Sequence, residues 1–151
     1  MIQSRLLGRS FLAVLSGYLT VAILVVLITP LAVWLFIPAD LLKQGKSAYT
    51  DAYIISNFVY SFGAAVVGGW VAGWMAPRNP YAHGGALAAV MLAFALGDIL
   101  ASKAPEIAAR QPSWYGWAVA LTGAAGALVG GWIRARQRQR PNDTAATATT
   151  A

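Results

Sequence analysis

The chain contains no cysteine and a single histidine, His83. Without cysteine, it forms no disulfide, binds no metal through thiolates and performs no thiol chemistry. One histidine without an acidic cluster beside it argues against a structural metal site. The sequence therefore predicts no bound metal or cofactor.

Charged residues are also scarce: they make up 11% of the 151 residues, whereas 58% are hydrophobic. An ordinary soluble domain carries about 25% charged and 45–50% apolar residues. This composition predicts a membrane protein. Because four apolar segments occupy nearly the whole length, we expect one membrane domain over residues 1–134 and no separate soluble domain.

Motifs of the common enzyme active sites are missing as well. The sequence has no Walker loop, no HExxH motif and no GxGxxG motif. Its two Gly-Gly-Trp segments lie within apolar stretches, where glycine serves helix packing rather than phosphate binding. We therefore expect a noncatalytic protein.

Four apolar segments are each long enough to cross a bilayer as a helix of about 20 residues. The first follows Arg5 and Arg9, and it exceeds the 7 to 15 apolar residues typical of a signal peptide, so we interpret it as an uncleaved span. Two prolines, Pro77 and Pro80, enclose a tight turn that makes the second and third spans antiparallel neighbours. The predicted fold is an all-α membrane protein, an antiparallel bundle of four transmembrane helices at about 11–37, 52–76, 81–102 and 114–133.

The distribution of Lys and Arg predicts the orientation of this bundle. Seven of the 11 Lys and Arg residues flank the ends of spans on one side, and four flank them on the other. Because positive residues favour the cytoplasmic side, both termini are expected in the cytoplasm. The predicted location is a bacterial cytoplasmic (inner) membrane.

Residues 135–151 begin with basic residues and continue as an Ala/Thr-rich segment. Because this segment has little apolar bulk, we expect a disordered cytoplasmic tail. Arginines beside a span end suit anionic lipid headgroups better than nucleic acid. The residues expected to contact these headgroups are Arg134, Arg136, Arg138 and Arg140.

Small residues recur at a spacing of four along three of the predicted spans. This spacing places them on one face of a helix and allows close approach of another helix. Such faces also suit a homo-oligomer or another membrane protein as partner. The glycines expected at these contacts are Gly68, Gly69, Gly73, Gly85, Gly97, Gly126 and Gly130.

One short segment occurs twice: Val-Gly-Gly-Trp-Val at 67–71 resembles Val-Gly-Gly-Trp-Ile at 129–133. A duplication of two helical hairpins would produce this similarity. Convergence on a packing motif would produce it equally well, and the sequence does not separate the two.

Asp98 is the only acidic residue within a predicted apolar span, which makes it a candidate ion or proton site. Counting residues from the turn places Asn57 at the same level on the second span, so an Asn–Asp pair is expected. Tyr60, Thr29 and Ser102 are expected at a related depth. Such a pair either fixes the register of two helices or forms part of a ligand site.

The leading functional hypothesis is a noncatalytic accessory, assembly or homo-oligomeric membrane subunit. The alternative is a small transporter or channel component that uses Asp98 and Asn57 in a polar site of the outer leaflet. Signalling at the membrane surface through the Arg-rich tail is a third possibility.

Overall fold

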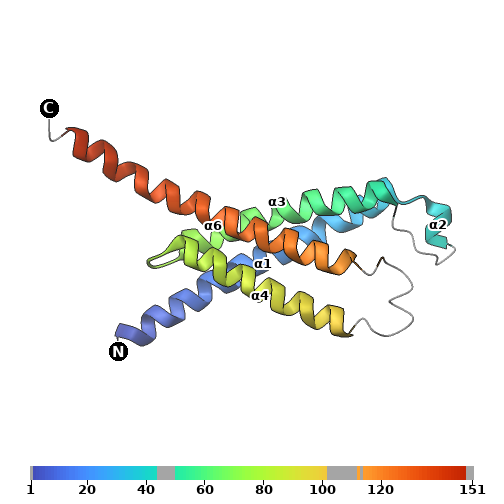
Figure 1. Ribbon diagram of the computed structural model, residues 1–151, viewed down its shortest axis with the longest axis horizontal. Helices are drawn as coiled ribbons and strands as arrows, with labels where there is room; N and C mark the ends of the chain where they lie inside the picture. The colour runs from blue at the N-terminus through green and yellow to red at the C-terminus, as the bar shows by residue number, and fades with distance from the viewer. Residues whose placement is uncertain (1, 44–49, 102–111, 113, 149–151) are drawn as a thin grey trace.

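The computed structural model describes residues 2–43, 50–101, 112 and 114–148. Within these residues, the regular structure is α-helical (Figure 1). Ser102, one of the residues expected in the polar site, lies outside the described residues. The helices are α1 (Ile2–Phe36), α2 (Ala39–Lys43), α3 (Asp51–Met75), α4 (Pro80–Ala101) and α6 (Tyr115–Ala148).

Four of these helices are long and apolar enough to cross a membrane, which confirms the prediction of an all-α chain with four helices of spanning length. Large apolar side chains such as Leu27 and Val59 are exposed, at 68% and 69%. A soluble protein rarely leaves so much apolar surface in water, whereas lipid accommodates it. The architecture is that of an integral membrane protein. The candidate spans are Leu7–Phe36, Asp51–Met75, Pro80–Leu100 and Tyr115–Gln139.

Local sequence signals explain where α3 and α4 begin and end. The Thr50 hydroxyl accepts a hydrogen bond from the Tyr53 amide at 3.2 Å and caps the N-terminus of α3. At the other end, Ala76 is extended, with φ −60° and ψ 130°, as favoured before a proline. The Asn79 side chain accepts from the Ala82 amide at 3.2 Å and caps α4, whose first residue is Pro80.

Two helices are longer than the spans predicted for them. α1 extends back to Ile2 and continues through Pro30. α6 continues past residue 133 to Ala148, whereas we expected an unfolded tail from residue 135. Arg, Gln and Ala are good helix formers, and Gln137 and Arg138 are additionally tied to α3 and its following turn.

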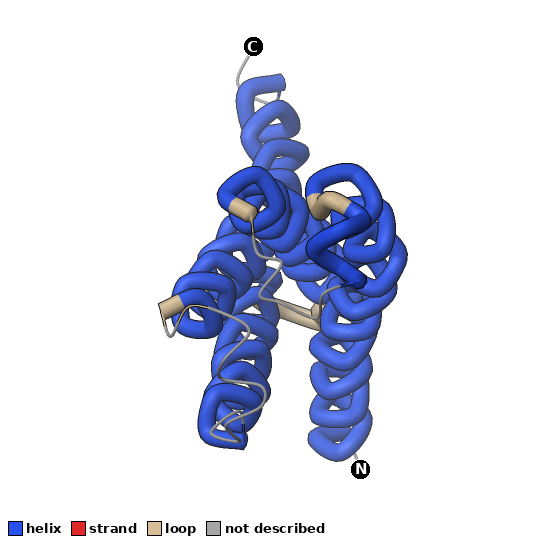
Figure 2. Tube along the Cα trace, turned by 90° about the vertical axis from the view of Figure 1, so that its right-hand side faces the viewer, coloured by secondary structure: helices blue, strands red, loops and turns tan. Residues whose placement is uncertain are grey.

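The chain runs back and forth along the long axis of the molecule (Figure 1). α3 packs mainly on α6 and α1, while α4 packs mainly on α6. Both ends of the described chain lie toward the same end of the long axis, and the view at right angles shows them well separated across it (Figures 1 and 2). α6 is therefore the helix that joins α3 and α4.

The buried core consists mostly of small side chains, so the helices approach one another closely. Leu87 is the one large side chain that is fully buried among the described residues. A second cluster lies near the end of α1 and the start of α3 and contains Ala32, Ile37 and Tyr53. The central cluster consists of Ala72, Leu87, Ala88, Ala124 and Ala127.

Candidate functional site

Glycines of α6 lie directly against the backbone of α3. A Cβ atom built on Gly126 would lie 2.7 Å from the carbonyl oxygen of Phe62. One built on Gly130 would overlap the carbonyl oxygen of Val66 and lie 2.6 Å from the Trp70 amide nitrogen. Real Cβ atoms do not approach backbone atoms this closely, so α3 and α6 touch only because these residues lack side chains.

The same face of α6 meets α4. A Cβ atom built on Gly84 would lie 2.9 Å from both the Ala127 carbonyl oxygen and the Gly131 Cα atom. Gly84 and Gly131 were not among the glycines expected at contacts. They neighbour Gly85 and Gly130 in the sequence, so the local composition indicated the contact region but not which residue faces the partner.

α1 also contacts α3 through a glycine that the sequence reading missed. A Cβ atom on Gly17 would lie 2.7 Å from the Gly68 carbonyl oxygen. Ala13, Gly17 and Val21 are all buried, and their spacing of four is the signal that identifies this face. We expected small faces only on the other three spans, but the first span has one as well.

The remaining predicted glycines differ in their surroundings. Gly69 lies against the Ala127 backbone, and Gly73 lies against Pro80 and the side chain of Arg134. Gly85 has only an ordinary contact, 3.8 Å from a Leu128 methyl carbon, and Gly97 has nothing within 4 Å.

The two similar segments, 67–71 and 129–133, lie on helices that pack against each other. Gly130 in the second segment meets Trp70 in the first, while Gly69 in the first meets Ala127, just before the second. Because the two segments pack on each other's helices, close packing requires small residues in both. It leaves duplication and convergence equally open.

A polar network links α1 and α3. The Asn57 side-chain amide donates to the Tyr60 hydroxyl, and this hydroxyl lies 3.0 Å from the Thr29 hydroxyl, so one of the two donates. Asn57 is buried, with 8% exposure, and its side-chain carbonyl oxygen has no hydrogen-bond partner. Three of the five residues expected at related depth are thus brought together.

Asp98 is exposed on α4, whereas its expected partner Asn57 donates to Tyr60 instead. At the level of Asn57, α3 faces the beginning of α6: the Phe58 ring lies 5.9 Å from Tyr115 and stacks 6.4 Å from Trp114. At this level α3 contacts α1 through the polar network and the start of α6 through Phe58.

The end of α4 also packs on α6, because a Cβ atom on Gly116 would lie 3.2 Å from the Ile99 side chain. Asp98 precedes Ile99 and points about 100° away from it around the helix. The Asp98 side chain is exposed at this end of α4.

Arginine side chains gather where α3 ends. Arg138 donates to the carbonyl oxygens of Ala76 at 2.9 Å, Arg78 at 3.3 Å and Trp74 at 3.5 Å. It thereby satisfies carbonyls that the end of α3 leaves without an intrahelical donor. The sequence indicated a basic cluster but not that one of its members caps another helix.

Two other arginines of the basic run lie over tryptophan rings. Arg134 is 5.8 Å from the Trp70 ring centroid, and Arg136 is 4.1 Å from that of Trp132. Gln137 accepts from the Trp70 indole at 3.0 Å and from Arg134 at 3.3 Å. Such cation–π contacts are typical of aromatic residues at a membrane interface.

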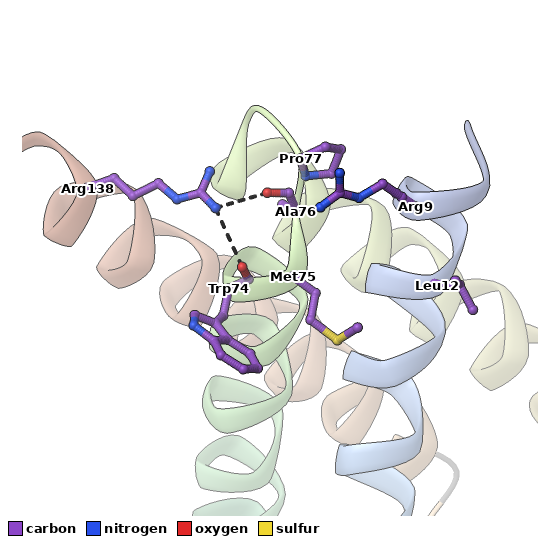
Figure 3. A pocket seen from close by; sticks show the side chains of 7 residues that line it. All are labelled: Arg9, Leu12, Trp74, Met75, Ala76, Pro77 and Arg138. Carbon is purple, nitrogen blue, oxygen red and sulfur yellow. Dashed lines mark hydrogen bonds between the residues drawn. The ribbon is translucent and has the colours of Figure 1, made fainter. Parts of the chain in front are cut away.

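A pocket of about 470 Å³ lies beside the end of α3 (Figure 3). Arg9 of α1 and Arg138 of α6 approach the Ala76–Pro77 segment from opposite sides in this view. The walls are otherwise mostly apolar, and the seven described residues that line the pocket include no carboxylate. They are Arg9, Leu12, Trp74, Met75, Ala76, Pro77 and Arg138.

The fold defines the class of the protein, an integral membrane protein with four candidate membrane-spanning helices. Among the described residues, no three His, Asp or Glu side chains are grouped so that they could hold a metal ion. Comparison with protein families, curated proteins and solved structures gives no match.

Proposed function

We propose that this chain is a small noncatalytic membrane protein that acts as an accessory or assembly subunit, alone or as a homo-oligomer. It forms an antiparallel bundle of four transmembrane helices in a bacterial cytoplasmic membrane, with both termini in the cytoplasm. The distribution of its 11 Lys and Arg residues supports this orientation. Anionic lipid headgroups contact the basic run from Arg134 to Arg140 on that side.

The observation that carries the proposal is the contact between helix backbones at the centre of the molecule. Gly130 places α6 against α3, Gly84 and Gly131 place it against α4, and Gly17 places α1 against α3. A transport pathway needs room for water or substrate between helices. Contacts in which even a Cβ atom has no space support a tightly packed scaffold instead.

The outer faces of α1 and α4 provide surfaces for assembly. The most apolar stretch of each of these two helices has a smaller share of buried residues than that of α3 or α6. Side chains such as Leu27 and Phe94 are exposed, at 68% and 59%. Gly97 on α4 has open space around it. These faces suit lipid, a second copy of the chain or another membrane protein.

A second candidate function is a small transporter or channel component. The observation that favours it is the Asn57 carbonyl oxygen, a buried acceptor without a partner beside the Tyr60 and Thr29 hydroxyls. An unpaired buried acceptor costs about 1–3 kcal/mol, and a bound cation or a donor group on a substrate would compensate for it. Asp98 would serve such a pathway only at its outer end.

Water access to α3 separates the two functions. Ser61 is buried, with 8% exposure, and lies one helical turn beyond Asn57. Because the chain has no cysteine, Ser61→Cys would carry the only thiol. Asp51→Cys places a thiol at an exposed position at the start of α3 and serves as the control. We expect a membrane-impermeant thiol reagent to label Ser61→Cys far more slowly than Asp51→Cys.

Labelling of both variants after unfolding in detergent controls for the reactivity of each thiol. Rapid labelling of Ser61→Cys in the native membrane would reject the packed scaffold and favour a water-filled pathway. Protection of Ser61→Cys alongside rapid labelling of Asp51→Cys would support the scaffold.

A further inference from the structure

We propose that the pocket at the end of α3 binds the phosphate group of an anionic phospholipid. The inference rests on one part of the proposed function, the placement of this end of the helices at the membrane surface. It goes beyond general attraction of lipid to the basic run, because it assigns a defined site. Arg9, which lies outside that run, is one of the two residues that bind the phosphate.

Arg138 is held in position before any ligand arrives. Its guanidinium donates to three carbonyl oxygens, those of Trp74, Ala76 and Arg78. A guanidinium has five N–H donors, so three hydrogen bonds leave two for a ligand. Arg138 therefore combines a fixed orientation with remaining donor capacity.

The partial negative charge of the carbonyls at the end of α3 offsets part of the Arg138 charge. A phosphate site here needs a second cation, and Arg9 supplies it from α1. In Figure 3 the Arg9 guanidinium is directed toward Pro77, on the opposite side of Ala76 from Arg138. Two guanidinium groups from different helices suit one phosphate, because planar guanidinium groups donate well to phosphate oxygens.

The apolar residues of the pocket indicate that the phosphate belongs to a lipid. Leu12, Trp74 and Met75 line the same pocket as the two arginines. Leu12 and Trp74 are exposed, at 53% and 57%, and both belong to candidate spans. A free phosphate ion gains nothing from such walls, whereas the glycerol and upper acyl carbons of a phospholipid bury apolar surface against them.

Position along the chain agrees with this assignment. Arg9 lies two residues before Phe11, where the long apolar run of α1 begins, and Met75 is the last residue of α3. The pocket thus lies where apolar helices meet a polar turn, the level at which lipid phosphates are found. Its volume of about 470 Å³ falls within the 300–1,000 Å³ typical of ligand sites.

The test measures thermal unfolding of the purified full-length chain in a neutral detergent, by tryptophan fluorescence. The chain is titrated separately with dioctanoyl phosphatidylglycerol, dioctanoyl phosphatidylcholine and inorganic phosphate. We expect phosphatidylglycerol to raise the unfolding temperature in a saturable manner, and the other two to have much weaker effects. An equal response to inorganic phosphate would overturn the lipid assignment, and an equal response to phosphatidylcholine would overturn recognition of an anionic lipid.

Three variants distinguish a defined site from diffuse charge attraction. Arg9→Gln and Arg138→Gln are each expected to weaken the response to phosphatidylglycerol about tenfold, the effect of losing one charge-assisted hydrogen bond. Arg78→Gln removes the same charge from an exposed residue of the turn after α3, whose side chain does not line the pocket, and should retain the affinity. Equal weakening by Arg78→Gln, or full affinity in Arg9→Gln, would overturn the proposal.

Arg9→Gln is the decisive variant, because Arg138→Gln also removes the cap of α3 and lowers stability by itself. Labelling of Arg78→Cys from the cytoplasmic side reports the placement of this end independently. If Arg78→Cys is labelled from the cytoplasmic side but no lipid binds, only the proposed lipid site is rejected. Labelling of Arg78→Cys from outside would instead reject the orientation in the proposed function.

Discussion

At Gly130 the backbones of α3 and α6 touch. The atoms around Gly130 therefore indicate how much stability a single added methyl group would cost. The Cβ atom of an alanine there would overlap the Val66 carbonyl oxygen. Backbone atoms of a packed helix cannot rotate away as a side chain does, so the helices would have to separate. Gly97 on α4 has nothing within 4 Å of the position of an added Cβ atom, so a methyl group there meets no neighbour.

We expect Gly130→Ala to destabilise the protein by about 1–3 kcal/mol, the usual cost of overpacking. Gly97→Ala should change stability by less than about 0.5 kcal/mol, as for a surface substitution. Unfolding of both variants in detergent titrations provides the comparison. Equal stability of Gly130→Ala and the unsubstituted chain would contradict the close contact between α3 and α6.

Residue spacing predicted the polar groups better than it predicted their partners. Asn57, Tyr60 and Thr29 were expected at related depth, and the structure joins them by hydrogen bonds. Counting from the turn placed Asp98 level with Asn57, but level residues meet only if their helices stay adjacent and face each other. At this level α3 instead contacts α1 through Tyr60 and Thr29, and the start of α6 through Phe58.

Among the elements, the ends of α3 and α4 follow directly from short-range chemistry. Thr50 and Asn79 accept hydrogen bonds from amides three residues later, and Pro77 prevents α3 from continuing. These signals are readable in the sequence because both partners lie within one helical turn. The cap that Arg138 supplies to α3 from α6 is not readable in this way, because its partners lie about 60 residues away.

The cap of α4 can be tested by changing Asn79. Asn79→Ala removes the side-chain acceptor for the Ala82 amide and is expected to cost about 1 kcal/mol of stability. Asn79→Asp keeps an acceptor in the same position and should retain most of that stability. Thermal unfolding of the two variants in the same detergent tests this capping role. Equal destabilisation by both variants would contradict it.

The choice of neighbours among the helices was harder to predict than their ends. Faces of small residues on three of the spans were visible in the sequence. Which face meets which helix depends on contacts between distant segments, such as Gly68 with Gly17 and Gly69 with Ala127. Spacing alone therefore identified contact faces without assigning their partners, and it overlooked the face that contains Gly17.

For the molecule as a whole, composition was sufficient to predict four helices of spanning length. The length and low charge of each segment fix this number, because each crossing needs about 20 apolar residues. The charge distribution adds a proposed orientation, with Arg9, Arg78 and the basic run on one side and Lys43 on the other. The proposed scaffold function and the proposed lipid pocket both depend on this arrangement in the membrane.

The sidedness of single cysteines in intact bacterial cells tests this arrangement most directly. Gly8→Cys, Arg78→Cys and Arg136→Cys should react with a membrane-impermeant maleimide only after the cells are permeabilised. Asp40→Cys and Asp51→Cys should react in intact cells, because the proposed orientation places them outside. Labelling of Gly8→Cys or Arg136→Cys in intact cells, or protection of both outer positions until permeabilisation, would contradict four crossings with both termini in the cytoplasm.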